Sequence, residues 1–222
     1  MKRYALIVAG GKGLRMQSEL PKQFIPLNGL PVLMHTLNAF NHISNVCILL
    51  VLPVAQFNFW KQLCVQHKFN LVHQLVAGGQ TRFHSVSNGL NAIDDTDSLV
   101  AIHDGVRPLI DPGIIEAGYV MAEEKGNAVA VVRLKDSIRK VELLGNHSVN
   151  RNNYYLVQTP QTFHTKNIQA AYANANHFNF TDDAGVIDEA GGKINLLEGD
   201  YKNIKITSPE DLIIAKVFLG SE

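Results

Sequence analysis

Acidic residues are nearly absent from the first half of the chain. No Asp or Glu occurs between Glu19 and Asp94, and residues 1–93 hold eight Lys or Arg against one acid. A dinucleotide-binding fold needs an acid about 20 residues after its glycine loop to hold a ribose hydroxyl, so NAD binding is disfavoured. The excess of cations suits an anionic ligand instead. Because these cations are scattered and form no run, a nucleic-acid surface is also disfavoured.

Cysteine and long apolar runs are scarce as well. The two cysteines, Cys47 and Cys64, have no metal-ligand spacing, and we expect reduced, buried thiols in a cytoplasmic protein. The chain begins with a predicted strand and shows no signal-peptide pattern. Its longest apolar stretch, residues 46–54, is too short to span a bilayer. We therefore expect no membrane association.

What is present is a regular alternation of apolar strand-like runs with helix-like segments. Such alternation over 222 residues predicts βαβ units and a mostly parallel sheet covered by helices on both faces, an α/β fold. We expect residues 1–222 to form a single domain. The predicted strands span residues 4–9, 46–52, 71–76, 99–102 and 128–132, and the predicted helices span 33–40, 56–67, 83–93 and 112–124.

The alternation breaks near residue 134. Alternating polar and apolar residues around Gly145 predict an antiparallel hairpin between 136 and 149. An isolated hairpin is marginal in water, so we expect residues 134–157 to project as an arm that packs on a second subunit of a homodimer. Near the end, Ser208 and Pro209 are typical of a helix start, and this helix is predicted to run to about residue 219.

A glycine-rich loop follows the first predicted strand. Glycines let backbone N–H groups approach a ligand closely, and consecutive N–H groups form an anion-binding concavity. The spacing is not that of a P-loop. The loop predicts binding of a nucleoside triphosphate; the alternative is a strand-to-helix turn with solvated lysines. Its glycines and cations are Gly10, Gly11, Lys12, Gly13, Arg15 and Lys22.

Three polar loops, 9–22, 77–85 and 103–108, follow predicted strands, and ligands of parallel sheets bind beyond the carboxyl ends of strands. In the third loop, Asp104 could hold Mg²⁺ together with phosphate oxygens, and Arg107 could bind a phosphate or a carboxylate. The alternative is a turn in which these two residues pair with each other. In the second loop, backbone groups could read a base edge, or Thr81 could simply cap the following helix.

Two further segments leave alternatives open. Lys205 lies in a predicted short strand, 203–207. It either protects an exposed edge from aggregation or points inward to phosphate as a catalytic cation. The Thr-Asp-Asp sequence at 181–183 could cap a helix or contact a substrate.

Taken together, these motifs resemble the sugar-phosphate cytidylyltransferases, most closely the branch that acts on 2-C-methyl-D-erythritol 4-phosphate. They occur in the family's order along nearly the whole chain. The matching motifs are Ala-Gly-Gly-x-Gly-x-Arg-Met…Pro-Lys-Gln (9–23), His-Asp-x-x-Arg-Pro (103–108), Gln-Thr-Pro-Gln-x-Phe (158–163), Thr-Asp-Asp (181–183) and Asn-Ile-Lys-Ile-Thr-x-Pro-Glu-Asp-Leu (203–212).

The resemblance implies a Rossmann-like nucleotidyltransferase that uses Mg²⁺ to transfer CMP from CTP to the polyol phosphate, releasing pyrophosphate in the non-mevalonate isoprenoid pathway. It implies that Arg15 and Lys22 stabilise the α-phosphate transition state, that Lys205 neutralises charge between the substrates, and that Asp104 positions the metal and substrate hydroxyls. The implied CTP-binding residues are Ala9, Gly10, Gly11, Gly13, Gly79 and Ser85. Those implied on the polyol side, partly across a dimer interface, are Asp104, Arg107, Ser137, Arg151, Thr159 and Thr181.

The chain departs from the family pattern at three places. Gln80 stands where an acid is common, Ser137 where a threonine is common, and Gly105 with Val106 where two alanines are common. The Ala-Gly-Gly opening (9–11) and Val106 before Arg107 also occur in the D-ribitol 5-phosphate cytidylyltransferases, which are the alternative interpretation. A non-catalytic nucleotide-binding protein is the alternative of another class.

Overall fold

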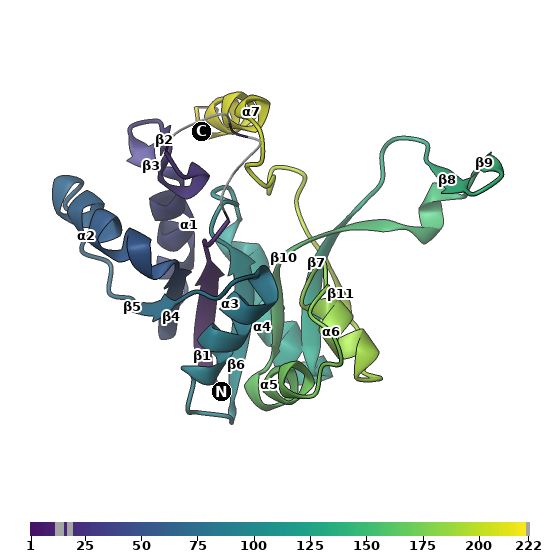
Figure 1. Cartoon of the computed structure of the whole chain (residues 1–222), viewed down its shortest axis with the longest axis horizontal. Helices are drawn as coiled ribbons and strands as arrows, with labels where there is room; N and C mark the ends of the chain where they lie inside the picture. Colours follow the sequence, from purple (N-terminus) through teal and green to yellow (C-terminus); the bar gives the residue numbers. More distant parts are fainter. Residues whose placement is uncertain (12–15, 17–19, 221–222) are drawn as a thin grey trace.

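The computed structural model describes residues 1–11, 16 and 20–220. Its centre is a seven-stranded sheet in the order β11-β7-β10-β6-β1-β4-β5 (Figure 1). All neighbouring pairs are parallel except those of β10, which runs antiparallel to both β6 and β7. The predicted mostly parallel sheet is therefore confirmed. The strands are β1 (Lys2–Val8), β4 (Val46–Leu52), β5 (Gln74–Ala77), β6 (Ser98–Asp104), β7 (Asn127–Arg133), β10 (Tyr155–His164) and β11 (Leu196–Glu198).

Helices cover both faces of this sheet. Side chains alternate along a strand, so Leu6 of β1 enters one apolar core while Ile7 enters the other. The first core packs against α3, α5 and α6, and the second against α1, α2 and α4. A third, smaller cluster lies under α7. The helices are α1 (Val32–Asn41), α2 (Phe57–Gln66), α3 (Arg82–Asn91), α4 (Pro112–Lys125), α5 (Thr165–Ala173), α6 (Ala184–Glu189) and α7 (Pro209–Leu219).

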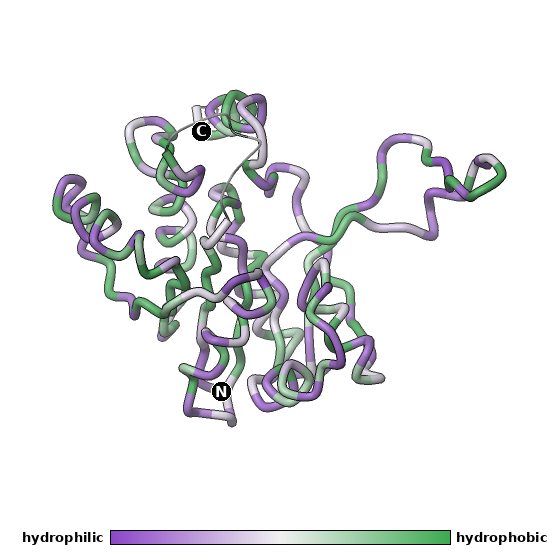
Figure 2. Tube along the Cα trace, viewed as in Figure 1, coloured by the Kyte–Doolittle hydropathy of each residue, from purple (hydrophilic) through white to green (hydrophobic). Residues whose placement is uncertain are grey.

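The predicted arm is a hairpin that extends away from the sheet (Figure 1). Its strands, β8 (Arg139–Glu142) and β9 (Gly145–Ser148), are antiparallel, and every residue in them is exposed. Leu143 and Leu144 at the tip are 100% and 99% exposed. Figure 2 shows this apolar tip in green. Two exposed leucines at the end of a hairpin leave apolar surface for a partner to cover.

The last helix begins where the sequence predicts. Ser208 is the N-cap of α7, and Asp211 completes a capping box with it. The short elements are the pair β2 (Pro26–Leu27) and β3 (Leu30–Pro31) and the 3-10 turns η2 (Lys22–Phe24), η3 (Val54–Gln56) and η4 (Arg151–Asn153).

Three local predictions are wrong. Cys47 is exposed, because burial along β4 begins only at Ile48, while Cys64 is half-buried. Residues 203–207 form no strand; the Ile206 N–H bonds to the Val106 carbonyl at 2.8 Å, and the segment lies along a loop rather than in a sheet. The predicted strand at 71–76 begins only at Gln74.

Candidate active site

The described beginnings of the three polar loops lie together at the carboxyl ends of the strands, as predicted. Each loop begins with a backbone hydrogen bond to a neighbouring strand: Ala9 N to Val51 O at 3.0 Å, Gly78 N to Leu52 O at 2.8 Å, and Gly105 N to Val8 O at 2.8 Å. The bonds extend the parallel register beyond β1, β5 and β6. They place the loop backbones side by side at the carboxyl ends of the strands, where α/β proteins bind ligands.

Close backbone approach explains the glycines of this edge. A Cβ on Gly79 would lie 2.4 Å from the Cβ of His84, and one on Gly105 would lie 2.8 Å from the Cβ of Ala9. Neither contact is sterically possible without displacement. A Cβ on Gly10 would lie 3.7 Å from Ser85 Oγ. The residues expected on the CTP side, Ala9, Gly10, Gly79 and Ser85, are therefore brought together.

Local hydrogen bonds fix the loop before α3. Gly79 N donates to Ser85 Oγ at 3.0 Å, and Ser85 Oγ donates to the Thr81 carbonyl at 2.9 Å. Thr81 Oγ1 accepts from His84 N at 3.3 Å, so the capping role of Thr81 is confirmed. The loop is thus held rigid by its own side chains, and its outer backbone edge remains exposed at Gly79 and Gln80.

Asp104, at the end of β6, is surrounded by cations. Its carboxylate lies 3.0 Å from Lys205 Nζ and 3.3 Å from Arg107 Nε, and 3.7 Å from Arg82 Nε. The pairing of Asp104 with Arg107 is thus confirmed, but within a larger cluster. Burial by itself would raise the pKa of Asp104, and the three cations outweigh it and hold that pKa well below its ordinary value. The carboxylate is ionised throughout the physiological range.

Both predicted catalytic lysines that the structure describes reach this region. Lys205 points inward at Asp104 rather than guarding a sheet edge. Lys22 Nζ donates to the Ile206 carbonyl, beside Lys205, at 3.2 Å. A Cβ on Gly11 would lie 3.7 Å from Lys22 Cε, which places this lysine against the glycine loop. Gly13 and Arg15 lie outside the described residues.

The 203–206 segment is fastened along the Asp104 loop. Arg107 Nη1 donates to the Asn203 carbonyl at 2.8 Å. The fully buried Asn203 side chain donates to the Thr159 carbonyl at 2.8 Å. These bonds orient Lys205, although the segment belongs to no sheet, and they fix Arg107 beside Asp104. Burial lowers the pKa of Arg107, an effect that Asp104 opposes.

His103 and Thr159 hold the Asp104 backbone from the sheet side. His103 Nε2 lies 3.2 Å from the Arg107 carbonyl, which can only accept, so this nitrogen carries the hydrogen. His103 Nδ1 then accepts from Thr159 Oγ1 at 3.1 Å, and that oxygen accepts from Asp104 N at 3.1 Å. Burial lowers the pKa of His103 to about 4. The neutral ring is therefore fully hydrogen-bonded and available to no substrate.

Sequence reasoning missed Arg82. Its guanidinium donates to both carboxylate oxygens of Asp183, at 2.8 and 2.7 Å, as well as approaching Asp104. Asp183 outweighs the effect of burial and raises the pKa of Arg82. The only signal in the sequence was a basic residue just after the second glycine loop, and nothing local indicated its partner 101 residues away. His103 was part of the predicted 103–108 motif but received no role, because nothing local indicated that Thr159 would hydrogen-bond its ring.

Three predicted substrate residues are not joined to this cluster by any contact among the described residues. Thr181 is exposed, next to Asp182. Ser137 and Arg151 are exposed on the projecting arm, where Arg151 donates to the Lys135 carbonyl. If Thr181, Ser137 and Arg151 bind the polyol phosphate, the substrate or a second subunit must bring them to the Asp104 cluster.

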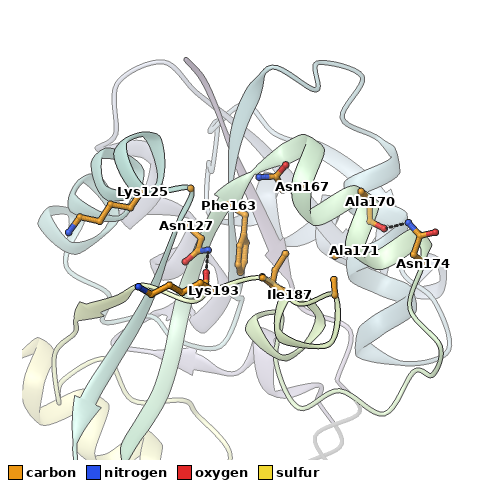
Figure 3. A pocket seen from close by; sticks show the side chains of 12 residues that line it. Lys125, Asn127, Phe163, Asn167, Ala170, Ala171, Asn174, Ile187 and Lys193 are labelled. Carbon is orange, nitrogen blue, oxygen red and sulfur yellow. Dashed lines mark hydrogen bonds between the residues drawn. The ribbon is translucent and has the colours of Figure 1, made fainter.

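A separate hollow lies at the opposite end of the sheet, by the start of β7. It encloses about 660 Å³ beside Phe163 and Ile187. Figure 3 shows that the amino groups of Lys125 and Lys193 point away from these two side chains. The hollow therefore lacks the converging cations that distinguish the Asp104 edge.

Comparison with known proteins identifies the family of this chain. The family model described as 2-C-methyl-D-erythritol 4-phosphate cytidylyltransferase matches residues 4–221. The chain belongs to this cytidylyltransferase family. A relative of the same name from Bacteroides thetaiotaomicron is 47% identical over 220 residues, covering 99% of this chain and 100% of the relative. Another from Geotalea uraniireducens is 41% identical over 228 residues, covering 100% and 98%.

Solved structures of the cytidylyltransferase family share the fold. The 4-diphosphocytidyl-2C-methyl-D-erythritol synthase of Anaerococcus prevotii superposes with a TM-score of 0.85 at 30% identity, covering 98% of this chain and 96% of that one. The 2-C-methyl-D-erythritol 4-phosphate cytidylyltransferase of Thermus thermophilus gives 0.81 at 30% identity, with 98% of each chain covered. The Rossmann-like nucleotidyltransferase fold is thus confirmed. Within residues 1–11, 16 and 20–220, no helix is long and apolar enough to cross a membrane.

Proposed function

We propose that the chain transfers CMP from CTP to 2-C-methyl-D-erythritol 4-phosphate, forming 4-CDP-2-C-methyl-D-erythritol and pyrophosphate in the non-mevalonate isoprenoid pathway. The observation that carries this proposal is the gathering of Lys205 and Arg107 around Asp104, with Lys22 bonded to the nearby Ile206 carbonyl, beside two glycine loops in a chain of this family. Such an edge is suited to two phosphate-bearing substrates. The two free thiols are compatible with the cytoplasm as the proposed location.

The chemistry requires charge and position rather than a base. A phosphate oxygen of the polyol attacks the α-phosphorus of CTP, the bond from that phosphorus to the β-phosphate oxygen breaks, and pyrophosphate leaves with the electron pair. The nucleophile is already an anion. This agrees with a site where both nitrogens of His103 are bonded and Asp104 is held ionised. Catalysis then rests on alignment and on stabilising negative charge.

Each cation has a proposed part in this reaction. Lys22, against the glycine loop, binds the triphosphate and stabilises the α-phosphate transition state, a role shared with Arg15 by resemblance. Lys205 moves between Asp104 and the incoming phosphates, which its half-exposed side chain permits. Arg107 and Thr159 complete the polyol side, and Thr181 contacts a hydroxyl. The cytidine lies against the backbone of the two glycine loops and Ser85.

The family's enzymes depend on a metal ion, and Asp104 fits as its holder here. The described residues contain no group of three or more His, Cys, Asp or Glu side chains that could cage a metal. Mg²⁺ commonly takes only one or two carboxylates, with phosphate oxygens and water as the remaining ligands. The single ionised carboxylate of Asp104 supplies such a donor once Lys205 shifts. Bound Mg²⁺ would add positive charge at the phosphate oxygens of CTP.

The arm is the proposed dimer contact. Of the predicted arm, 134–157, residues 134–154 extend from the domain (Figure 1), whereas 155–157 pair with β7 as the start of β10. The leucine tip, Tyr154 and Leu156 are exposed and offer apolar surface for a second subunit. Such a dimer would place Ser137 and Arg151 of one subunit near the polyol phosphate of the other. The proposed dimer and the proposed single domain both rest on the exposure of the arm and on the family resemblance.

The deciding experiment is a pyrophosphate-release assay with CTP and Mg²⁺. We expect turnover with 2-C-methyl-D-erythritol 4-phosphate and little with D-ribitol 5-phosphate. Lys22→Ala should abolish most of this turnover, whereas Lys61→Ala, which removes an exposed lysine of α2, should leave it unchanged. Turnover with the ribitol phosphate alone would keep the mechanism and overturn the substrate. Release with neither would overturn the proposal.

A further inference from the structure

Arg82 occupies a position between two carboxylates. It is the first residue of α3, directly after the Thr81 cap, so its backbone moves with the second glycine loop. Its side chain spans outward from there, with Nη1 and Nη2 on Asp183 and Nε at 3.7 Å from Asp104. A planar guanidinium that grips one carboxylate with two parallel bonds is geometrically fixed in a way that a lysine could not match.

Asp183, the partner of Arg82, is held in place by several further hydrogen bonds. Asp183 is fully buried, and its Oδ1 also accepts from Tyr172 OH at 2.6 Å. Its backbone N–H and that of Ala184 donate to Oε1 of the buried Gln161, at 3.1 and 2.7 Å. Gln161 Nε2 in turn donates to Asp182 Oδ2 at 3.1 Å. The loop 181–183 is thus attached to β10 by its backbone and to α3 by the guanidinium.

This arrangement connects the two substrate sides. The loop 78–81 belongs to the CTP side, whereas Thr181 is two residues from Asp183 on the polyol side. Asp104 lies between them. When Lys205 leaves Asp104 for the phosphates, Arg82 and Arg107 are the described cations that remain against that carboxylate. Arg82 therefore controls the spacing of both loops and the orientation of Asp104.

We propose that the Arg82–Asp183 ion pair is a positioning device that sets the alignment of the polyol phosphate relative to CTP, an inference that rests on the proposed function. Neither residue need touch the reacting atoms. Because a displacement of about 1 Å at a reacting centre can cost about a hundredfold in rate, loosening this contact should affect the second substrate and the chemical step. Binding of CTP alone, through the loop's own hydrogen bonds, should persist.

The test is a steady-state and binding comparison of Arg82→Lys, Asp183→Asn and the double variant. We expect kcat/KM for 2-C-methyl-D-erythritol 4-phosphate to fall about tenfold or more in each single variant, with the Kd of CTP from isothermal titration within about twofold of wild type. The double variant should be no worse than the more impaired single variant, because both changes break one contact.

A matched control separates position from folding. Arg3→Lys alters another arginine–carboxylate contact, in which Arg3 Nη1 donates to both oxygens of Glu116 at 2.8 Å, at the opposite end of β1, and it should change neither constant. If Asp183→Asn does not fold, Arg82→Lys, which keeps the charge, decides alone. Equal losses for CTP and the polyol phosphate, or additive effects in the double variant, would overturn the inference. A wild-type chain that binds CTP yet turns over neither polyol phosphate overturns the proposed function, and this inference with it.

Discussion

The buried histidine of the Asp104 edge should dominate the pH dependence of stability in mildly acid solution. In the folded chain, burial lowers the pKa of His103 to about 4, against an ordinary value of 6.5. At a pH between these two values, His103 is therefore protonated in the unfolded chain but not in the folded chain. It follows that the free energy of unfolding decreases as the pH falls from about 6.5 to about 4 and is not reduced further by this group below that.

The magnitude follows from the two pKa values. Each pKa unit corresponds to about 1.4 kcal/mol, so the full difference is about 3 kcal/mol, of which about 2 kcal/mol is lost between pH 7 and pH 4.5. The physical origin is burial, because protonation of Nδ1 would place a positive charge on a ring that is shielded from water. The pH range in which His103 affects stability is separate from the pH range in which Asp104 does. The lowered pKa of that carboxyl contributes stability above its ordinary value of 3.8 that is lost only in stronger acid.

The assay is urea unfolding at a series of pH values between about 7 and 4.5. The His103→Gln variant should be less stable at neutral pH, since it disturbs bonds to Thr159 and Arg107, but it should lose about 2 kcal/mol less than wild type over the series. His147→Gln, which changes an exposed histidine of β9, is the control and should follow wild type. If His103→Gln shows the same fall in stability as wild type, the assignment of a buried neutral ring is refuted.

The remaining predictions concern activity. Lys22→Ala should lower kcat about a hundredfold or more, the scale of losing one preorganised transition-state contact, and near-normal turnover would refute its role. Gly79→Ala should raise the KM for CTP about tenfold, because its Cβ would lie 2.4 Å from that of His84; an unaltered KM would contradict the close approach. Arg151→Ala should impair the polyol phosphate rather than CTP. Mixing Arg151→Ala with Lys22→Ala subunits should restore part of the activity, and no recovery after confirmed subunit exchange would contradict a site shared across the dimer.

The fold was largely readable from local pattern, with one informative exception. Continuous apolar runs such as 46–52 can be buried only between two layers of helices, and β4 spans those residues. The strand β10 was missed because its Gln-Thr-Pro-Gln stretch is polar and contains a proline, and therefore resembles a loop. It nevertheless pairs with both β6 and β7, with an irregular register between Val157 and Gln161. The polar side chains of Gln158, Thr159 and Gln161 are buried and hydrogen-bonded inside the protein rather than exposed to water.

The sequence by itself determined which chemistry this chain carries. The sequence shows a glycine loop after the first strand, cations without nearby acids, and Asp104 at the end of a strand. These features can be recognised locally, and the carboxyl ends of parallel strands bring them to one side of the sheet. The tertiary structure decided how those groups are connected. Whether Lys205 guards an edge or faces Asp104, and whether Arg82 has a partner, depend on segments about a hundred residues apart in sequence. Hydrophobic periodicity does not predict such side-chain pairs, because they form only when the fold places loops from separate strands next to each other.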